Sequence, residues 1–179
     1  MKLIFLGAQG SGKSTQAKML AGSLSLPYIE MGQLLRDRAK DMDFEAGEIS
    51  LALETGNLVP DLIAVKTLQE RISKNDCKKG FVLDGYPRNY AQLEGLPPGI
   101  DKVFYIKISD NIGIKRLINR NRRDDNLDVI TRRLEIYHRE TEPLLTYFKQ
   151  AGTLIEIDGE KTMGEVSHEI LEKLDLQKR

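Results

Sequence analysis

The sequence predicts an α/β fold, in which helices cover both faces of a parallel sheet. Short apolar runs rich in β-branched or aromatic residues alternate with longer amphipathic stretches, the pattern of right-handed βαβ units. The runs are residues 3–6, 81–83, 103–108 and 154–157, with 27–29 as a weaker fifth. In such a fold, ligands bind in the crevice at the carboxyl ends of the strands.

Helical stretches fill the intervals between these runs. Residues 14–24 follow the first run, and three later stretches repeat apolar residues at helical spacing. Their expected buried stripes are Leu62, Val65, Leu68 and Ile72; Leu127, Ile130, Leu134 and Tyr137; and Met163, Val166, Ile170 and Leu174. Residues 30–80 are too many for one crossover, so we expect 30–59 to be a helical insertion over the crevice.

Composition narrows the function classes. The chain has 179 residues, 40% of them apolar, enough for one domain with a sizeable core. Its 27 basic and 27 acidic residues cancel, which argues against general nucleic-acid or membrane binding. The single cysteine, Cys77, excludes an intramolecular disulfide and a cysteine-based zinc site. No signal peptide or membrane span is apparent, so we expect a cytoplasmic location.

A phosphate-binding loop follows the first predicted strand. Residues 7–14, GAQGSGKS, match G-x-x-x-x-G-K-[ST] between a strand and a helix. The backbone of Gly10, Ser11 and Gly12 can point successive N–H groups at an anion, and Lys13 can follow the β- and γ-phosphates. The hydroxyl of Ser14, or that of Thr15, can ligate Mg²⁺. No Asn-Lys-x-Asp motif accompanies the loop, as a GTPase would require.

A carboxylate and an arginine follow the third predicted strand. Asp84 can hold the water shell of Mg²⁺, or it can cap the next helix. Gly85 lets a ligand approach the backbone, and Pro87 restricts the directions in which Arg88 points. A guanidinium held there can bind a phosphate through two parallel hydrogen bonds. After a phosphate-binding loop, the functional interpretation dominates.

These motifs together resemble the adenylate kinase family and the related nucleoside monophosphate kinases. The resemblance covers essentially the whole chain. It is carried by residues 7–17, 32–36, 56–61, 84–88, 123–126 and 137–143. It implies a P-loop nucleotide kinase with a five-stranded parallel sheet in the order 2-3-1-4-5. We expect a single domain, 1–179, with a core of 1–29, 60–118 and 126–179, a monophosphate-binding insertion at 30–59 and a minimal lid loop at 119–125.

The resemblance also assigns roles to residues. The expected catalytic residues are Lys13, Asp84, Arg88, Arg120, Arg122 and Arg133. The residues expected to bind ATP are Gly10, Ser11, Gly12, Lys13, Ser14, Thr15, Arg116, Arg120 and Lys161. Those expected to bind AMP are Met31, Arg36, Asn57, Val59, Gly85, Arg88, Gln92, Arg122 and Arg133. Mg²⁺ is expected with ATP, through Ser14 and Asp84 and by way of water. Arg123 and Arg132 match no role, and Asp124 and Asp125 are expected at the lid hinge as helix-capping or arginine-pairing residues instead of metal ligands.

Three departures from the family pattern affect the interpretation. Only Asn121 separates Arg120 from Arg122, so the lid is short and carries no zinc. Ser14 and Gln9 stand where the family usually has Gly and Pro. Residues 30–33, EMGQ, replace a segment of the Thr-Gly-Asp type, and Met31 cannot donate a hydrogen bond to a base as Thr does.

The sequence therefore predicts an adenylate kinase that transfers a phosphoryl group from MgATP to AMP and acts as a monomer. Gln92 favours AMP as the acceptor, whereas Arg88 and Asn89 resemble UMP/CMP kinases. A shikimate-type kinase is disfavoured by residues 56–61 and 84–88. The third alternative is a nucleotide-binding assembly or regulatory factor with little turnover. His138, His168 and Cys77 are expected to have no catalytic role.

Overall fold

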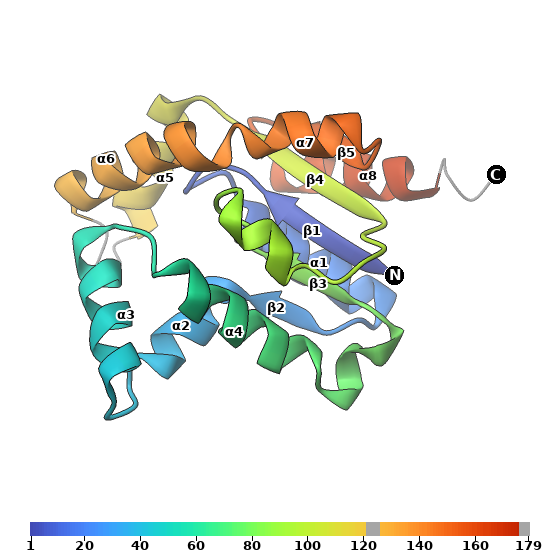
Figure 1. Cartoon of the computed structure of the whole chain (residues 1–179). Coiled ribbons are helices and arrows are strands. Elements are labelled where there is room, and N and C mark those ends of the chain that lie inside the picture. The colour runs from blue at the N-terminus through green and yellow to red at the C-terminus, as the bar shows by residue number, and fades with distance from the viewer. Residues whose placement is uncertain (121–125, 176–179) are drawn as a thin grey trace.

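The computed structural model describes residues 1–120 and 126–175, which form a parallel sheet between layers of helices (Figure 1). The strands are β1 (Lys2–Leu6), β2 (Tyr28–Glu30), β3 (Phe81–Asp84), β4 (Lys102–Lys107) and β5 (Leu154–Asp158). They pair in the order β2-β3-β1-β4-β5, and every pair is parallel. The predicted strands and their order are thus confirmed.

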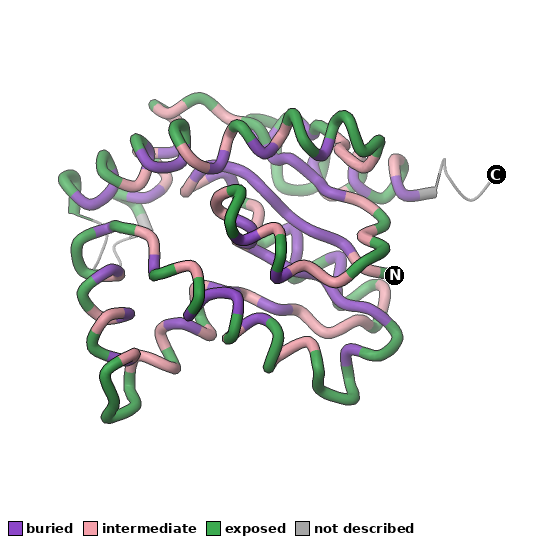
Figure 2. The backbone as a smooth tube through the Cα atoms, viewed as in Figure 1, coloured by how far each residue is buried: buried purple, intermediate pink, exposed green. Residues whose placement is uncertain are grey.

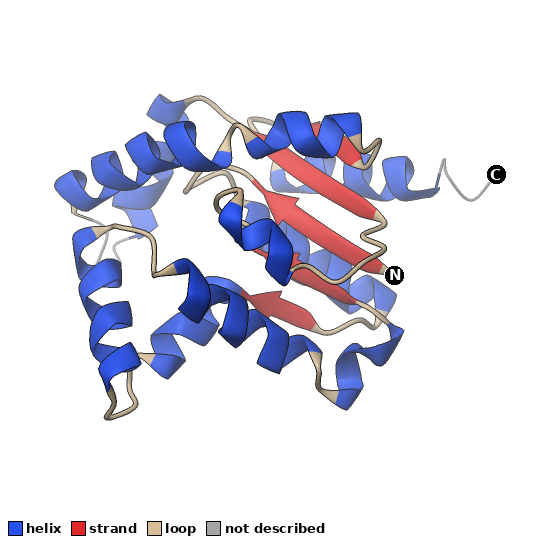
Figure 3. Cartoon of the chain, viewed as in Figure 1, coloured by secondary structure: helices blue, strands red, loops and turns tan. Residues whose placement is uncertain are grey.

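The helices connect successive strands and frame their carboxyl ends (Figure 3). They are α1 (Lys13–Leu24), α2 (Met31–Arg38), α3 (Phe44–Thr55), α4 (Asp61–Ile72), α5 (Asp110–Arg120), α6 (Leu127–Ile136), α7 (Leu144–Gln150) and α8 (Met163–Asp175). Two 3-10 helices, η1 (Asn75–Lys79) and η2 (Ala91–Gly95), and a π-helix, η3 (Tyr137–Thr141), complete the connections. No helix within residues 1–120 and 126–175 is long and apolar enough to cross a membrane.

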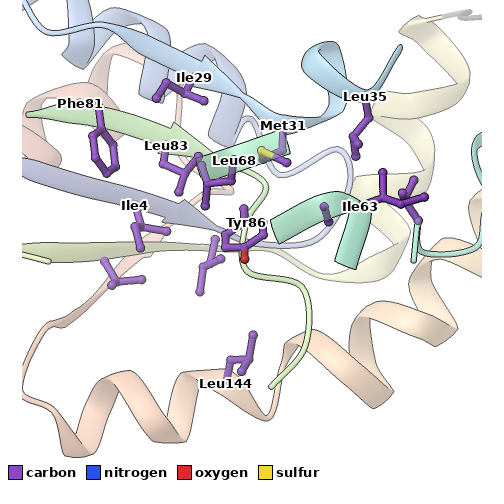
Figure 4. Packing of buried hydrophobic residues seen from close by; sticks show 14 of the residues in the cluster. Ile4, Ile29, Met31, Leu35, Ile63, Leu68, Phe81, Leu83, Tyr86 and Leu144 are labelled. Atoms are coloured by element: carbon purple, nitrogen blue, oxygen red, sulfur yellow. The ribbon is translucent and has the colours of Figure 1, made fainter. Parts of the chain in front are cut away.

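Both faces of the sheet are buried, as the continuous apolar strands predict (Figure 2). Alternate residues of β1 point to opposite sides. Leu3 and Phe5 pack with α1 and α8, whereas Ile4 and Leu6 pack with residues of α2, α3, α4 and α7. Figure 4 shows part of the second cluster, which reaches from the sheet to Met31, Leu35 and Tyr86. The core therefore supports the segments that follow β2 and β3.

The predicted helical stripes are correct except at their first members. Leu62, Leu127 and Met163 are 80%, 59% and 58% exposed, whereas the later members of each stripe are buried or partly buried. Each exposed residue lies in the first turn of its helix. At that end the helix has not yet reached the surface against which its later turns pack, so a stripe of the right period finds no partner there.

The interval between β2 and α4 contains two helices, as expected for residues 30–59. Asp43 caps the start of helix α3, because its side chain accepts a hydrogen bond from the Ala46 N–H. The helix ends at Gly56, which has a left-handed conformation with φ 74°. Most of the predicted lid, residues 121–125, lies outside the described part of the chain.

Candidate functional site

A cavity of about 400 Å³ opens at the carboxyl ends of the strands, where the fold predicts a ligand. It is bordered by the phosphate-binding loop, the segment after β3, helix α2, the end of α3 and helix α6. Its lining includes Gly10, Gly12, Lys13, Ser14, Thr15, Met31, Arg36, Asn57, Val59, Asp84, Gly85, Arg88, Gln92, Arg116 and Arg133. Segments far apart in the sequence thus meet in one space.

The phosphate-binding loop has the backbone that its glycines permit. Gly10 and Gly12 have φ values of 82° and 87°, and α1 begins immediately afterwards at Lys13. A Cβ at Gly10 would lie 2.5 Å from the Gly113 carbonyl oxygen, so α5 approaches the loop too closely for a side chain. The Lys13 ammonium donates to the Ala8 carbonyl at 3.3 Å. The Ser11 N–H donates to the Ala8 carbonyl at 3.2 Å, whereas Gly10, Gly12 and the first residues of α1 line the cavity, where the helix N-terminus favours an anion.

Asp84 ends β3 as a buried carboxylate. Its Oδ2 accepts a hydrogen bond of 3.0 Å from the Tyr28 hydroxyl, while its Oδ1 has no partner among the described residues. Burial, and after it the negative charges of Asp84 and Glu30, raises the pKa of Tyr28, so the phenol stays protonated as a donor. Tyr28 thereby orients Asp84 and leaves one carboxylate oxygen available.

Arg88 is held by hydrogen bonds from several directions. Its N–H donates to Gln92 Oε1 at 2.9 Å, its carbonyl accepts from Thr141 at 2.7 Å, and its Nε donates to the Gly85 carbonyl at 3.0 Å. Gly85 makes room for the guanidinium, because a Cβ there would lie 3.3 Å from Nη2. The Arg88 backbone is therefore fixed while both terminal nitrogens lack an acceptor among the described residues.

Positive charge accumulates around Arg88. Its burial lowers the pKa of Arg88, the Asp84 carboxylate raises it, and the guanidinium groups of Arg133 and Arg36 lower it further. Three arginines close enough to affect one another are costly unless an anion lies between them. This electrostatic arrangement suits a phosphate ligand.

Arg36 lies on α2 and lines the same cavity as Arg88. Its Nη2 donates to Glu30 Oε1 at 2.8 Å and to Gln33 Oε1 at 3.0 Å, and its Nε donates to Gln33 Oε1 at 3.2 Å. A Cβ at Gly32 would lie 3.2 Å from Nη1, so the glycine lets the guanidinium lie over the start of α2. Glu30 is a cavity residue that we did not predict as part of the site.

Three further arginines connect separate elements. Arg133 on α6 donates to the Leu53 carbonyl near the end of α3 at 3.2 Å, and Arg132 donates to Asn57 Oδ1 at 3.1 Å. Arg116 on α5 donates to the Gly159 carbonyl at 3.1 Å and to the Gly10 carbonyl at 3.4 Å. Arg132, expected to have no ligand role, instead joins α6 to the segment after α3.

Gln92 is buried with its amide engaged. Its Nε2 donates to Asp61 Oδ1 at 2.8 Å, and the same oxygen accepts from Asn89 Nδ2 at 2.8 Å. Because Gln92 Oε1 also accepts from Arg88, the amide orientation is defined by its neighbours. One N–H of the amide stays available to a base.

Two residues that were predicted to bind ATP do not line the cavity. Ser11 is buried without lining the cavity, and Lys161 is an exposed residue that forms an ion pair with Glu169 at 3.0 Å. Arg120 is the last residue of α5, and the expectations for its side chain and for Arg122, Arg123, Asp124 and Asp125 lie outside the described residues. Within residues 1–120 and 126–175, no three His, Cys, Asp or Glu side chains form a metal-binding group.

The two remaining candidates outside the cavity have ordinary structural partners. His138 contacts Asp110 at 3.0 Å and Glu142 at 2.7 Å. The hydrogen bond with Glu142, and then that with Asp110, raises the pKa of His138. Cys77 is buried, which raises its pKa, and its sulfur accepts from Arg71 at 3.0 Å. This environment does not activate the thiol.

Sequence reasoning missed several residues that position the site. Tyr28, Glu30, Asp61 and Thr141 act through neighbours or line the cavity. Asp61 and Thr141 lie in the motif segments 56–61 and 137–143, but no role was assigned to either residue. The signal for Glu30 was its departure from the family pattern. For Tyr28 the signal was the expected pairing of β2 with β3. This pairing sets Glu30 beside Asp84 and brings Tyr28, two residues earlier, close to the Asp84 carboxylate.

Comparisons with known proteins agree with this geometry. A model of the adenylate kinase family matches residues 5–153. Adenylate kinase 1 of Nostoc sp. is 37% identical over 176 residues, which cover 94% of this chain and 96% of that protein. The adenylate kinases of Parvibaculum lavamentivorans and Prochlorococcus marinus are each 38% identical. The first match covers all of this chain and 94% of that protein, and the second 98% and 97%. The chain therefore belongs to the adenylate kinase family.

Proposed function

We propose that this protein catalyses the reversible transfer of a phosphoryl group from MgATP to AMP, giving two ADP. The observation that carries the proposal is the single cavity region in which the phosphate-binding loop faces Arg36, Arg88 and Arg133. A donor phosphate on the loop and an acceptor phosphate among the arginines would lie in the same space. Family membership supports the same reaction.

On the donor side, the backbone from Gly10 to Thr15 holds the ATP phosphates, and Lys13 neutralises charge that develops during transfer. Arg116 lies between the loop and Gly159, where its guanidinium can flank the adenine. Lys161 would have to leave Glu169 to contact ATP. Arg120 and Arg122 complete the proposed set from the lid.

On the acceptor side, Arg36, Arg88 and Arg133 bind the monophosphate, with Arg122 from the lid. The base lies against Met31 and Val59, near Asn57, Gly85 and Gln92. The acceptor oxygen is already anionic, so no general base is needed. Catalysis then consists of positioning and charge stabilisation.

Mg²⁺ fits the residues present. Asp84 has a buried oxygen that no described residue hydrogen-bonds, and the Ser14 hydroxyl lines the same cavity. Oxygen ligands of this kind suit Mg²⁺, which usually retains several waters. When bound with ATP, the ion supplies charge neutralisation at the phosphates.

Closure of residues 30–59 and of the 119–125 loop over the core would exclude water from the transferring phosphate. The division of the chain into core, insertion and lid is part of this proposal. The contacts of Arg132 and Arg133 with Asn57 and Leu53 support it, because they join the insertion to the core. We also expect a cytoplasmic monomer.

The proposal is tested by measuring ADP formation with MgATP and each of AMP, CMP, UMP, GMP and dTMP, with a control lacking acceptor. Strong turnover that depends on AMP is expected, since the Gln92 amide retains an N–H for the base. Preference for CMP or UMP would overturn the choice of base but retain the arginine roles. Nucleotide binding detected as a rise in Tm, without turnover on any acceptor, would favour a binding factor.

A further inference from the structure

The two acceptor-site arginines on α2 and after β3 differ in their available donors. A guanidinium binds a phosphate with two parallel N–H groups, taken either from Nε and Nη2 or from Nη1 and Nη2. In Arg88 the Nη1 and Nη2 edge lacks an acceptor among the described residues, because only Nε is engaged. Arg88 can thus bind a phosphate without losing a hydrogen bond.

Arg36 has no such open edge. Both edges include Nη2, and its two hydrogens are directed at Glu30 and Gln33. The Nε hydrogen is also directed at Gln33. A bidentate bond from Arg36 to a phosphate therefore requires that Arg36 release Glu30 or Gln33.

Glu30 is held in this position by the sheet. It is the last residue of β2 and pairs in register with Asp84 of β3, so the pleat sets its side chain beside the cavity. The Tyr28 hydroxyl lies 3.4 Å from its Oε2 and 3.0 Å from Asp84 Oδ2. The side chains of Glu30 and Arg36 are 26% and 33% exposed, so water screens their ion pair only in part.

We infer that Glu30 is a specificity-determining residue that occupies Arg36 in place of the acceptor phosphate and thereby weakens AMP binding. The inference rests on the proposed function, and it identifies Glu30 as the residue that lowers the affinity of the protein for its acceptor, AMP. A phosphate bound through Nη1 and Nη2 must displace the Glu30 carboxylate from Arg36, and one bound through Nε and Nη2 must displace Gln33. In either position the phosphate lies near the negative charge of Glu30. Both effects act on a phosphorylated acceptor and neither acts on an uncharged nucleoside.

The test measures equilibrium binding of AMP and of adenosine by calorimetry, together with the KM values for AMP and ATP, in the wild type and in Glu30→Gln. The substitution keeps the shape and removes the charge. A partly exposed ion pair is worth up to about 1 kcal/mol, so AMP affinity should rise about threefold to fivefold. The KM for AMP should fall in parallel, while adenosine affinity and the KM for ATP stay unchanged.

Asp41→Asn is the matched control. It neutralises a carboxylate just after the same helix, but Asp41 forms an ion pair with Arg38 and does not line the cavity. It should leave AMP affinity unchanged. Glu30→Ala and the Tm of each variant show whether an effect comes from altered folding instead of lost charge.

A double-mutant cycle with Arg36→Ala tests whether Glu30 affects AMP binding through Arg36. If Glu30 acts by occupying Arg36, Glu30→Gln should improve AMP affinity less in the Arg36→Ala background. AMP affinity that is unchanged or lower in Glu30→Gln, with a wild type that turns over AMP, would overturn the inference alone. A wild type that neither binds nor phosphorylates AMP would instead overturn the proposed function.

Discussion

The segment after β3 and the start of α2 both present an arginine to the acceptor side of the cavity, but they hold it differently. Arg88 belongs to a network of buried hydrogen bonds that includes Gln92 and Thr141. Arg36 is held by a partly exposed ion pair and by an exposed glutamine. The first region is organised for its ligand before binding, and the second must exchange partners.

The two arginines therefore differ in how much of their binding energy is available for catalysis. A donor that is fixed before the reaction stabilises transition-state charge without reorganisation. A donor that must first leave a carboxylate contributes less to affinity, by the free energy of the contact that it breaks. Four experiments test how these contacts contribute to activity and stability.

The largest effect is expected for Arg88→Ala. Turnover with AMP should fall by at least about two orders of magnitude, as for loss of a charged contact to the transferring group. Lys13→Ala should lose as much, because it removes the cation that neutralises charge on the donor phosphates during transfer. Arg139→Ala, which changes an arginine paired on the surface with Glu140, is the control. Wild-type turnover in either cavity variant would remove the proposed mechanism.

Gln92→Met tests whether the network around Arg88 matters beyond base recognition. It removes the bonds to the Arg88 N–H and to Asp61, so turnover should fall roughly tenfold and unfolding should need about 2 kcal/mol less free energy. The exposed Gln69→Met is the matched control. A loss with AMP alone, while CMP and UMP remain equally poor substrates and stability is unchanged, would mean that Gln92 only reads the base.

Arg36→Ala should have a smaller effect, and chiefly on the KM for AMP. We expect an increase of about threefold to tenfold, because binding to the phosphate is offset by release of Glu30. Steady-state kinetics with varied AMP at saturating ATP measures it. A loss of turnover as large as that of Arg88→Ala would show that the segment after β3 and the start of α2 contribute equally to catalysis.

The smallest effect is expected at His138, another partly exposed polar contact. Its pKa in the folded state is raised above the ordinary value of 6.5 by Glu142 and Asp110. The protonated form therefore stabilises the fold fully below about pH 6.5, and this contribution is lost as the pH rises through the raised pKa. Solvent exposure limits it to below about 1 kcal/mol.

Thermal unfolding between pH 6 and pH 8.5 checks this expectation. The difference in Tm between the wild type and His138→Gln should be largest at the low end and should vanish at the high end. His168→Gln serves as the control for loss of a histidine. A difference that grows with pH would contradict the assigned direction of the shift.

Sequence patterns predicted the fold well because they record local rules. The strands, their alternation with helices and the glycines of the phosphate-binding loop follow from periodicity and from backbone preference. The same rules misplaced Leu62, Leu127 and Met163, which are exposed at the first turns of their helices. Period identifies a helical face, but only the packed neighbour decides where along the helix that face becomes covered.

Local sequence is enough to identify the phosphate-binding loop, the arginines of the acceptor side and the carboxylate at the end of β3, because each is recognisable within a short segment. The tertiary structure decided which partner each of these groups meets. Thr141 reaches Arg88, Tyr28 reaches Asp84, and Arg133 reaches the end of α3. Such partners are set by strand register and helix packing, which join residues far apart in the chain and leave no local pattern.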